Sequence, residues 1–170
     1  MGASVAAFVE APAKLASLVL LLKGKRKFKY ILNGLLLGAV VGCGFAAFES
    51  AGYALRFGLL DIKDMIDIIQ IRGLLSPFAH IVWTAVAGAA LWRVMRGNSF
   101  HFGLCRPTES YMPFGLVVVC HFVLNLDFEI PFYGKYLVCG FVSWVAALNL
   151  FNLGIQEIRE EQLDVRGLRG

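Results

Sequence analysis

The sequence predicts an all-α fold, a polytopic membrane helix bundle with about five transmembrane helices, and two observations support this class. Of the 170 residues, 58% are hydrophobic and only 16% are charged, whereas a soluble domain carries about 25% charged residues. The apolar residues also gather into five stretches, and a helix needs about 20 such residues to cross a bilayer. The net charge is +4. Because the basic residues lie between the apolar stretches, we expect them to control membrane topology, and we expect no nucleic-acid partner.

Each predicted span is a run of apolar residues bounded by charged or turn-forming residues. The spans cover residues 5–22, 31–57, 76–95, 112–126 and 131–153. The second is long enough to tilt in the bilayer, and the fourth is short. Together they define a transmembrane domain over residues 1–155. A charged cytoplasmic tail over residues 156–170 follows, and we expect it to be frayed.

Loop charges predict how the spans are oriented. Segment 23–29 holds five basic residues, and further arginines follow the third span and end the chain. The opposite loops carry charges of both signs, at Arg56, Asp61, Lys63, Asp64, Asp67, Arg72, Asp127, Glu129 and Lys135. Because basic loops are retained in the cytoplasm, we expect the amino terminus outside the cell and the carboxyl terminus inside.

Two further features allow more than one interpretation. Residues 59–71 alternate apolar with charged residues, which indicates either an amphipathic helix on the outer surface or a solvated connector helix. Gly34, Gly38 and Gly42 form two overlapping GxxxG patterns, which permit close approach of another helix. This glycine stripe serves either internal packing or a homodimer face. The four cysteines show no CxxC spacing, and we interpret them as small core residues.

Polar residues inside four of the spans indicate a shared site. They are Glu10, Glu49, His80, His121 and Asn125. At a rise of about 1.5 Å per residue, the predicted orientation places all five in the outer half of the bilayer. Ionisable groups in hydrocarbon are costly and are usually retained for function. One of them alone could be a packing residue or a carboxylate wetted at the interface, but the agreement of four spans favours a common site.

Helical spacing indicates which side chains share a face. His121 and Asn125 are four residues apart, as are Glu10 and Lys14, so each pair lies on one side of its helix. Lys14 could pair with Glu10 in the low dielectric, or extend its amine toward the membrane surface. We expect the polar residues to face the interior of the bundle.

These residues resemble the motifs of the PrsW family of membrane-embedded peptidases, distant relatives of the type II CAAX prenyl endopeptidases. The family pattern is a Glu-Glu-x-x-Lys segment, a Phe-x-x-x-Glu segment, a histidine in a later span and a final His-x-x-x-Asn/Asp segment. The chain resembles the last three with Phe45-Ala-Ala-Phe-Glu49, with Arg72-Gly-Leu-Leu-Ser-Pro-Phe-Ala-His80 and with His121-Phe-Val-Leu-Asn125. The resemblance covers most of the chain from residue 8 to residue 126.

The first motif departs from the family pattern. Glu10-Ala11-Pro12-Ala13-Lys14 keeps one glutamate and the lysine, but Ala11 stands where the family has its second glutamate. Three explanations are open: an engineered inactivation, a natural loss that produces a pseudoenzyme, or a change that is tolerated because Glu10 is the essential carboxylate.

The resemblance implies an intramembrane endopeptidase that hydrolyses a peptide bond of a membrane-anchored protein, such as a single-span regulator, near the outer leaflet of a prokaryotic cell membrane. Its catalytic residues would be Glu10, Glu49, His80, His121 and Asn125. A glutamate near a histidine can deprotonate water, and a histidine with an asparagine can stabilise an oxyanion. Alternatively, Glu49, His80 and His121 could bind a divalent metal such as Zn²⁺. The chain has no HExxH motif, and its residues leave the metal-dependent and the metal-free mechanism both open.

Two other functions are compatible with the same residues. A catalytically inactive PrsW-like protein that acts by binding a membrane partner is favoured by Ala11. A small proton-coupled transporter is the second, because buried glutamate and histidine also form proton relays. The chain shows none of the internal repeats that are typical of transporters.

Overall fold

The computed structural model describes residues 2–25, 27–126, 128, 131 and 134–167. The predicted loop charges at Asp127 and Glu129 lie outside the described residues, as do Arg26 and Arg169.

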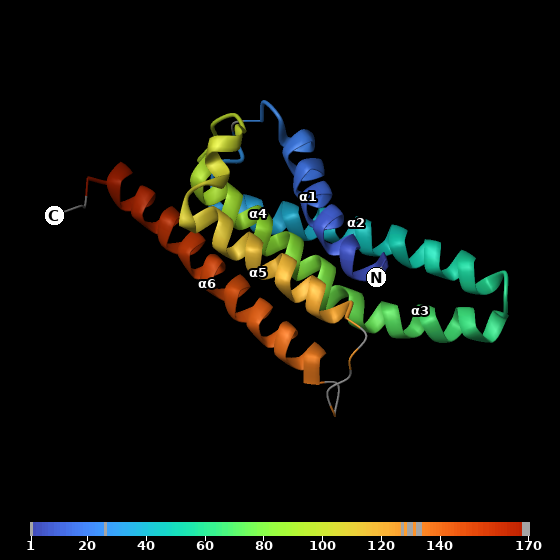
Figure 1. The fold of residues 1–170 in the computed structure, drawn as a ribbon. Coiled ribbons are helices and arrows are strands. Elements are labelled where there is room, and N and C mark those ends of the chain that lie inside the picture. The colour runs from blue at the N-terminus through green and yellow to red at the C-terminus, as the bar shows by residue number, and fades with distance from the viewer. Residues whose placement is uncertain (1, 26, 127, 129–130, 132–133, 168–170) are drawn as a thin grey trace.

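All regular structure in the described residues is helical, which confirms the all-α fold class (Figure 1). The elements are α1 (Gly2–Leu22), α2 (Ile31–Gly58), α3 (Ile62–Ser76), the π-helical segment η1 (Pro77–Ile81), α4 (Val82–Met95), the 3₁₀ segment η2 (Phe102–Cys105), α5 (Thr108–Leu124) and α6 (Gly134–Val165). By length and composition, α2 and α6 are long and apolar enough to cross a membrane, and α3 with α4 forms a third, bent candidate. Helix α5 is apolar but has only 17 residues, as the short fourth span predicts.

Helices α2 and α4 pack most closely, and glycines permit this contact. A Cβ atom at Gly34, Gly38 or Gly42 would lie 2.5 Å from a backbone oxygen of α4 or η1. The glycine stripe is therefore buried against α4 within one chain, which is the internal-packing interpretation. At Gly42 the backbone oxygen that is approached belongs to His80, so this contact also holds the start of α4 beside the part of α2 that carries Glu49.

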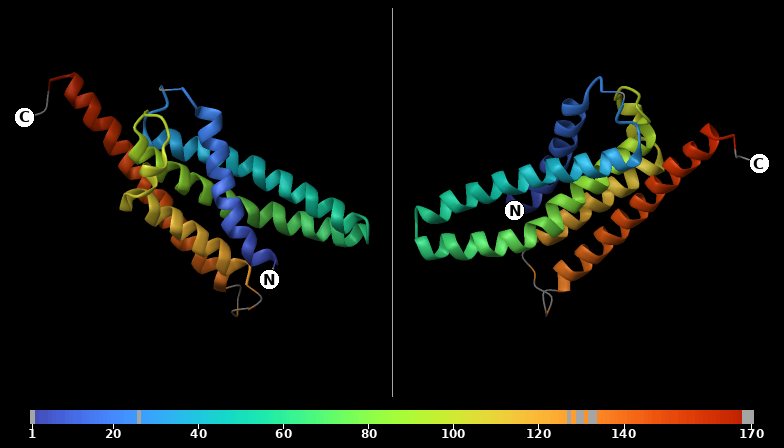
Figure 2. Two further views of the ribbon diagram at one scale, coloured as in Figure 1. Left: turned by 45° about the horizontal axis from the view of Figure 1, so that its top comes forward. Right: turned by 180° about the vertical axis from the view of Figure 1, so that it is seen from behind.

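The third predicted span is the second half of a longer helical segment. Helix α3 includes most of the predicted amphipathic stretch 59–71 and continues through η1 into α4, with a bend of 42°. Pro77, the first residue of η1, has no backbone N–H to donate to the preceding turn, and prolines and π-turns are common causes of helix bends. The α2–α3 hairpin extends beyond the other helices (Figure 2).

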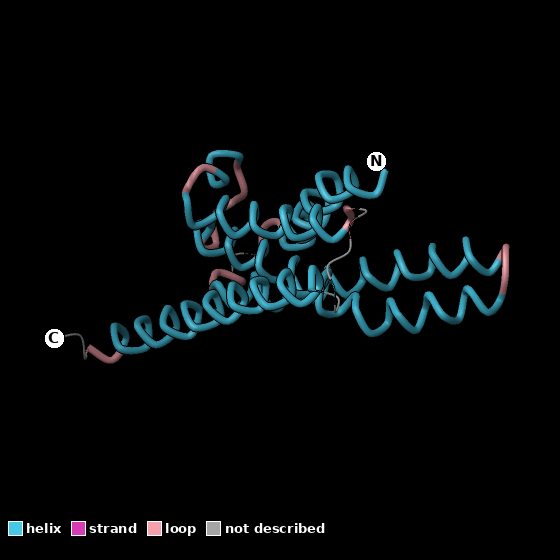
Figure 3. The backbone as a smooth tube through the Cα atoms, turned by 60° about the horizontal axis from the view of Figure 1, so that its bottom comes forward, coloured by secondary structure: helices cyan, strands magenta, loops and turns pink. Residues whose placement is uncertain are grey.

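The carboxyl-terminal segment differs from the predicted frayed tail, because α6 remains helical to Val165. Its extension is tied to the start of α2. Glu157 Oε2 accepts a hydrogen bond of 2.8 Å from the backbone N–H of Ile31, and Lys29 pairs with Glu161. A helix amino terminus leaves N–H groups without intrahelical partners, so the Glu157 carboxylate satisfies one of them. Figure 3 shows this extension at one end of the bundle and the α2–α3 hairpin at the other.

Candidate active site

A cavity of about 280 Å³ brings all five predicted site residues together. Glu10 comes from α1, Glu49 from α2, His80 from η1 and His121 from α5, and Asn125 directly follows α5. The cavity therefore depends on the packing of four separate segments. Both histidines are buried, whereas the glutamates and Asn125 are half-buried.

Glu10, His80 and His121 form a compact group of potential metal ligands. One ligand atom from each lies within 4.8 Å of the other two, and His121 Nε2 lies 3.7 Å from Glu10 Oε2. Two imidazoles with one carboxylate are the ligand set of many catalytic zinc sites, where bonds of about 2.0–2.2 Å leave a fourth position for water. The donor chemistry and the spacing fit a divalent ion after side-chain movements on the order of 1 Å.

Glu49 lies on the other side of His80 and has a different partner. Its Oε2 is 3.3 Å from His80 Nε2 and 2.9 Å from Arg72 Nη2. The sequence-based ligand set joined Glu49 to the two histidines, whereas the structure groups the histidines with Glu10 and places Glu49 against an arginine. The two carboxylates therefore have distinct surroundings within one cavity.

Lys14 is a member of this site that the sequence-based list omitted. Its ammonium is buried, lies 3.0 Å from Glu10 Oε2 and 2.8 Å from His80 Nδ1, and sits 4.0 Å from the centre of the Phe45 ring. Of the two interpretations of Lys14, the structure thus shows pairing with Glu10. The four-residue spacing from Glu10 was the available signal.

The Lys14 contact fixes the protonation pattern of His80. An ammonium group only donates hydrogen bonds, so His80 Nδ1 must accept. A neutral imidazole then carries its proton on Nε2, the nitrogen that faces Glu49. The same contact makes Lys14 and a metal ion competitors for the lone pairs of Glu10 and His80.

Arg72 is the second residue absent from the predicted site. The sequence analysis assigned it to an outer loop, at the start of the segment that resembles the third family motif. It lies in α3, stacks 4.3 Å from the centre of the Tyr53 ring and donates from Nε to Ser50 Oγ. Its Nη2 and Glu49 Oε2 are both buried, and their ionic contact lacks hydrogen-bond geometry. Eight residues separate Arg72 from His80, slightly more than two helical turns. This spacing could have revealed their shared face, had α3 and α4 been recognised as one segment.

Trp83 holds the second histidine in place. Its ring centre is 4.9 Å from that of His121, and its Nε1 donates to Ser143 Oγ at 2.9 Å. The backbone N–H of Asn125 bonds to the His121 carbonyl oxygen at 3.3 Å. The end of α5 is thus positioned by both α4 and α6.

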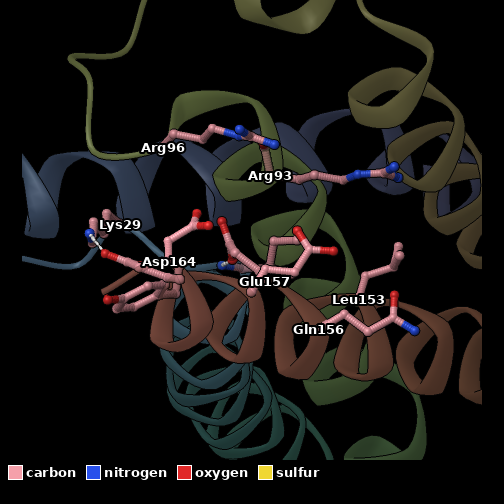
Figure 4. Close-up of a pocket in the computed structure, with 11 residues that line it drawn as sticks. Lys29, Arg93, Arg96, Leu153, Gln156, Glu157 and Asp164 are labelled. Carbon is pink, nitrogen blue, oxygen red and sulfur yellow. Dashed lines mark hydrogen bonds and ion pairs between the residues drawn. The ribbon is translucent and has the colours of Figure 1, made fainter. Parts of the chain in front are cut away.

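A second polar cavity, of about 490 Å³, lies between the start of α2, the end of α4 and the α6 extension (Figure 4). Charged residues of both signs line it, including Lys29, Arg93, Arg96, Glu157 and Asp164. None of its described lining residues is a histidine or a cysteine. Its residues therefore form a charged cleft without the ligand set of the first cavity.

Comparison with known protein families gives a match over most of the chain. The sequence model of the family described as PrsW family intramembrane metalloprotease matches residues 1–150. No curated protein and no solved structure matches the chain. The matched region contains every residue of the candidate site.

Proposed function

The chain belongs to the PrsW family of intramembrane metalloproteases, and on that premise we propose that it is an endopeptidase that cleaves a membrane-anchored protein near the outer face of a cell membrane. The observation that carries the proposal is the group of Glu10, His80 and His121 inside a polar cavity of an otherwise apolar bundle. Peptide hydrolysis needs an activated water, a polarised carbonyl and a proton for the leaving amine. The cavity holds groups for each task.

Glu10, His80 and His121 would hold a divalent ion, which when bound lowers the pKa of a water molecule and polarises a carbonyl. Glu49 is the general base in this proposal. Its carboxylate takes a proton as the water oxygen bonds to the carbonyl carbon, and then gives the proton to the leaving nitrogen as the C–N bond breaks. Arg72 Nη2 is buried without a hydrogen bond, so it can donate to the carbonyl oxygen as negative charge develops there.

The proposed orientation follows from the loop charges. Lys29, Arg93 and Arg96 lie at the start of α2 and the end of α4, whereas Glu49 and His80 lie toward the other ends of the same helical segments. Basic residues near span ends favour the cytoplasmic side. The candidate site then faces the outer half of the membrane.

A second candidate function is binding of a membrane partner without cleavage, and Ala11 favours it. Its side chain is only 6% exposed and does not line the cavity. A glutamate at this position would point about 100° away from Glu10 around the helix and would need room in a packed interior. A chain that has lost this residue and its surrounding space could retain the fold while losing turnover.

The test is cleavage of a library of tagged single-span proteins by purified protein in proteoliposomes, before and after chelation and zinc addition. We expect chelator-sensitive cleavage that Glu10→Gln and His121→Ala remove. The matched control is Glu161→Gln, the same chemical change in the exposed ion pair with Lys29. Cleavage that survives both site substitutions would overturn the proposal.

Ala11→Glu, tested in parallel, separates the two candidate functions. If this chain is an inactivated version of a working peptidase with an otherwise intact site, Ala11→Glu should raise cleavage by about 10²–10⁴-fold, the usual contribution of one acid–base group. Partner binding without turnover in both forms would favour the inactive relative. Equal cleavage by both forms would show that Glu10 suffices.

A further inference from the structure

The two carboxylates of the candidate site also line another cavity, which adjoins the first and is distinct from the charged cleft. It measures about 410 Å³ and is bounded by Glu10 of α1 and by α2 residues. Glu10 and Glu49 therefore lie between a polar cavity that contains both histidines and a groove that contains none. A hydrolytic centre needs two approaches to its reacting atoms, one for water and one for the peptide, and this arrangement provides two.

The wall of the groove is one face of α2. Its residues recur at helical spacing, at Phe45, Phe48, Gly52 and Arg56. Phe48 is 83% exposed, so its ring packs against little of the bundle. A Cβ atom at Gly52 would have no neighbour within 4 Å. The face is thus an aromatic surface with an open shelf beside it at Gly52.

The polar edges of the groove distinguish it from a surface that only contacts lipid. Glu10 and Glu49 line one edge of the groove, beside their partners Lys14 and Arg72, so a peptide backbone in the groove would lie close to the groups of the candidate site. Arg56 lies at the outer end of this groove. It is exposed and forms no ion pair with any residue in the described part of the chain. An unpaired cation at the end of an apolar groove is complementary to an acidic side chain of a partner.

We infer that this groove binds the substrate segment on the outer side of the scissile bond, with an apolar side chain over Gly52 against Phe48 and an acidic side chain near Arg56. The inference rests on the proposed function and adds a substrate class to it. Seven residues separate Glu49 from Arg56, or about 10 Å along the helix. An extended peptide covers that distance in about three residues. The acidic residue should therefore lie about three positions outward of the cleaved bond.

The test is a charge exchange between enzyme and substrate. With a single-span substrate that carries glutamate at the third outward position, Arg56→Glu should lower kcat/KM about 5-fold, the scale of an exposed ion pair. Changing the substrate glutamate to lysine should restore cleavage by the variant. Lys63→Glu is the control, because Lys63 is an exposed α3 residue that lines neither cavity and undergoes the same charge change. A loss with no restoration by the lysine substrate would overturn the inference.

The shelf at Gly52 gives an independent test. Gly52→Leu should fill the space over residue 52. It should lower kcat/KM by about 10-fold or more for substrates with leucine or phenylalanine beside the cleaved bond on its outer side, and should have little effect on substrates with alanine there. Equal effects on large and small residues would contradict the shelf.

Crosslinking separates failure of this inference from failure of the proposed activity. The photoreactive residue p-benzoylphenylalanine at position 48, in a Glu49→Gln background, should crosslink the substrate segment on the outer side of the cleaved bond. Crosslinking without cleavage by the parent protein would overturn the activity and support the groove. Cleavage by the parent protein with crosslinks confined to lipid would overturn the groove and leave the activity standing.

Discussion

Two clusters of charged residues at opposite ends of the bundle use similar side chains in different ways. In the candidate active site, Lys14 and both histidines are buried and contact two carboxylates. In the charged cleft of Figure 4, Lys29 and Glu161 form an ion pair while both side chains keep more than 40% of their surface exposed. The structure gathers desolvated charges of both signs where four segments converge on one cavity.

The difference separates two kinds of charge pair. A buried pair loses much of its hydration, so removing one partner leaves a group that the surroundings cannot compensate. An exposed pair contributes little, because water replaces the lost partner. The cleft therefore ties the α6 extension to the start of α2, whereas the cavity holds groups in a reactive arrangement.

The largest expected difference between the two regions is in catalysis. Glu10→Gln should lower cleavage by about 10²–10⁴-fold and should reduce bound zinc, because it removes a ligand group. Glu161→Gln makes the same chemical change in the cleft and should leave turnover within about 2-fold, as surface changes usually do. Turnover normalised to monodisperse protein, with elemental analysis for zinc, measures both. Similar losses in both variants would remove the distinction.

One added methyl group should strain the contact between α2 and η1 that holds Glu49 beside His80. Gly42→Ala would bring a Cβ atom to within 2.5 Å of the His80 backbone oxygen, and overpacking of this kind costs about 1–3 kcal/mol. The control is Gly44→Ala, where the added Cβ has no neighbour within 4 Å. Unfolding in mixed detergent micelles should show a loss for the first variant only. Unchanged stability and activity in Gly42→Ala would contradict the close α2–α4 contact.

Lys14→Met tests the competition between the ammonium and a metal ion. Because Lys14 bonds to Glu10 and His80, its removal should free their lone pairs and end the repulsion of an incoming cation. We expect zinc affinity to rise about 10-fold, a modest part of the repulsion between two charges 4 Å apart in a protein interior. Competition with a chelating dye measures the affinity. A fall in affinity would show that Lys14 positions the ligands instead of competing for them.

The smallest expected effect is the pH response of the cleft. The hydrogen bond with Glu161 raises the pKa of Lys29, and the same bond lowers the pKa of Glu161. The Glu161 contribution is therefore present above pH 4.5 and is lost as pH falls through its lowered pKa. The Lys29 contribution is present below pH 10.5 and is lost as pH rises through its raised pKa.

Hydrogen exchange of residues 157–165 measures this response. The amide exchange rate, divided by the rate of the unfolded peptide at the same pH, should be lowest in the pH range where Glu161 is ionised and Lys29 is protonated. Glu161→Gln should flatten the acid side of the profile. An unchanged acid side in that variant would assign the protection to another group, such as Glu157, which bonds to the backbone of Ile31.

The sequence predicted how deep each polar residue lies in the membrane better than it predicted which residues of other helices contact it. Position along a helix is set by a fixed rise per residue, so the shared level of Glu49, His80 and His121 could be counted from the span ends. Rotation and pairing depend on packing between helices. The approach of Gly42 to the His80 backbone, which brings η1 against α2, has no counterpart in the spacing within either helix.

The two missed residues illustrate the same limit. Arg72 was assigned to a loop because it falls between the predicted amphipathic stretch 59–71 and the third predicted span. In the structure α3 and α4 are joined through η1, and Arg72 of α3 contacts Glu49. Lys14 was recognised as a possible partner of Glu10, yet its contact with His80 spans 66 residues. Long-range partners of this kind require the tertiary structure.

The Glu10–Lys14 pair has a consequence for how the protein enters the bilayer during synthesis. Helix α1 is made before the segments that supply His80 and His121, so its glutamate first meets lipid without them. A lysine one turn away on the same helix neutralises that glutamate at once, and the helix can be inserted as a locally neutral unit. Glu49 has no such partner within α2 and depends on Arg72 of the following helix. Helices α2 and α3 are therefore best inserted together as a hairpin, while α1 can be inserted alone.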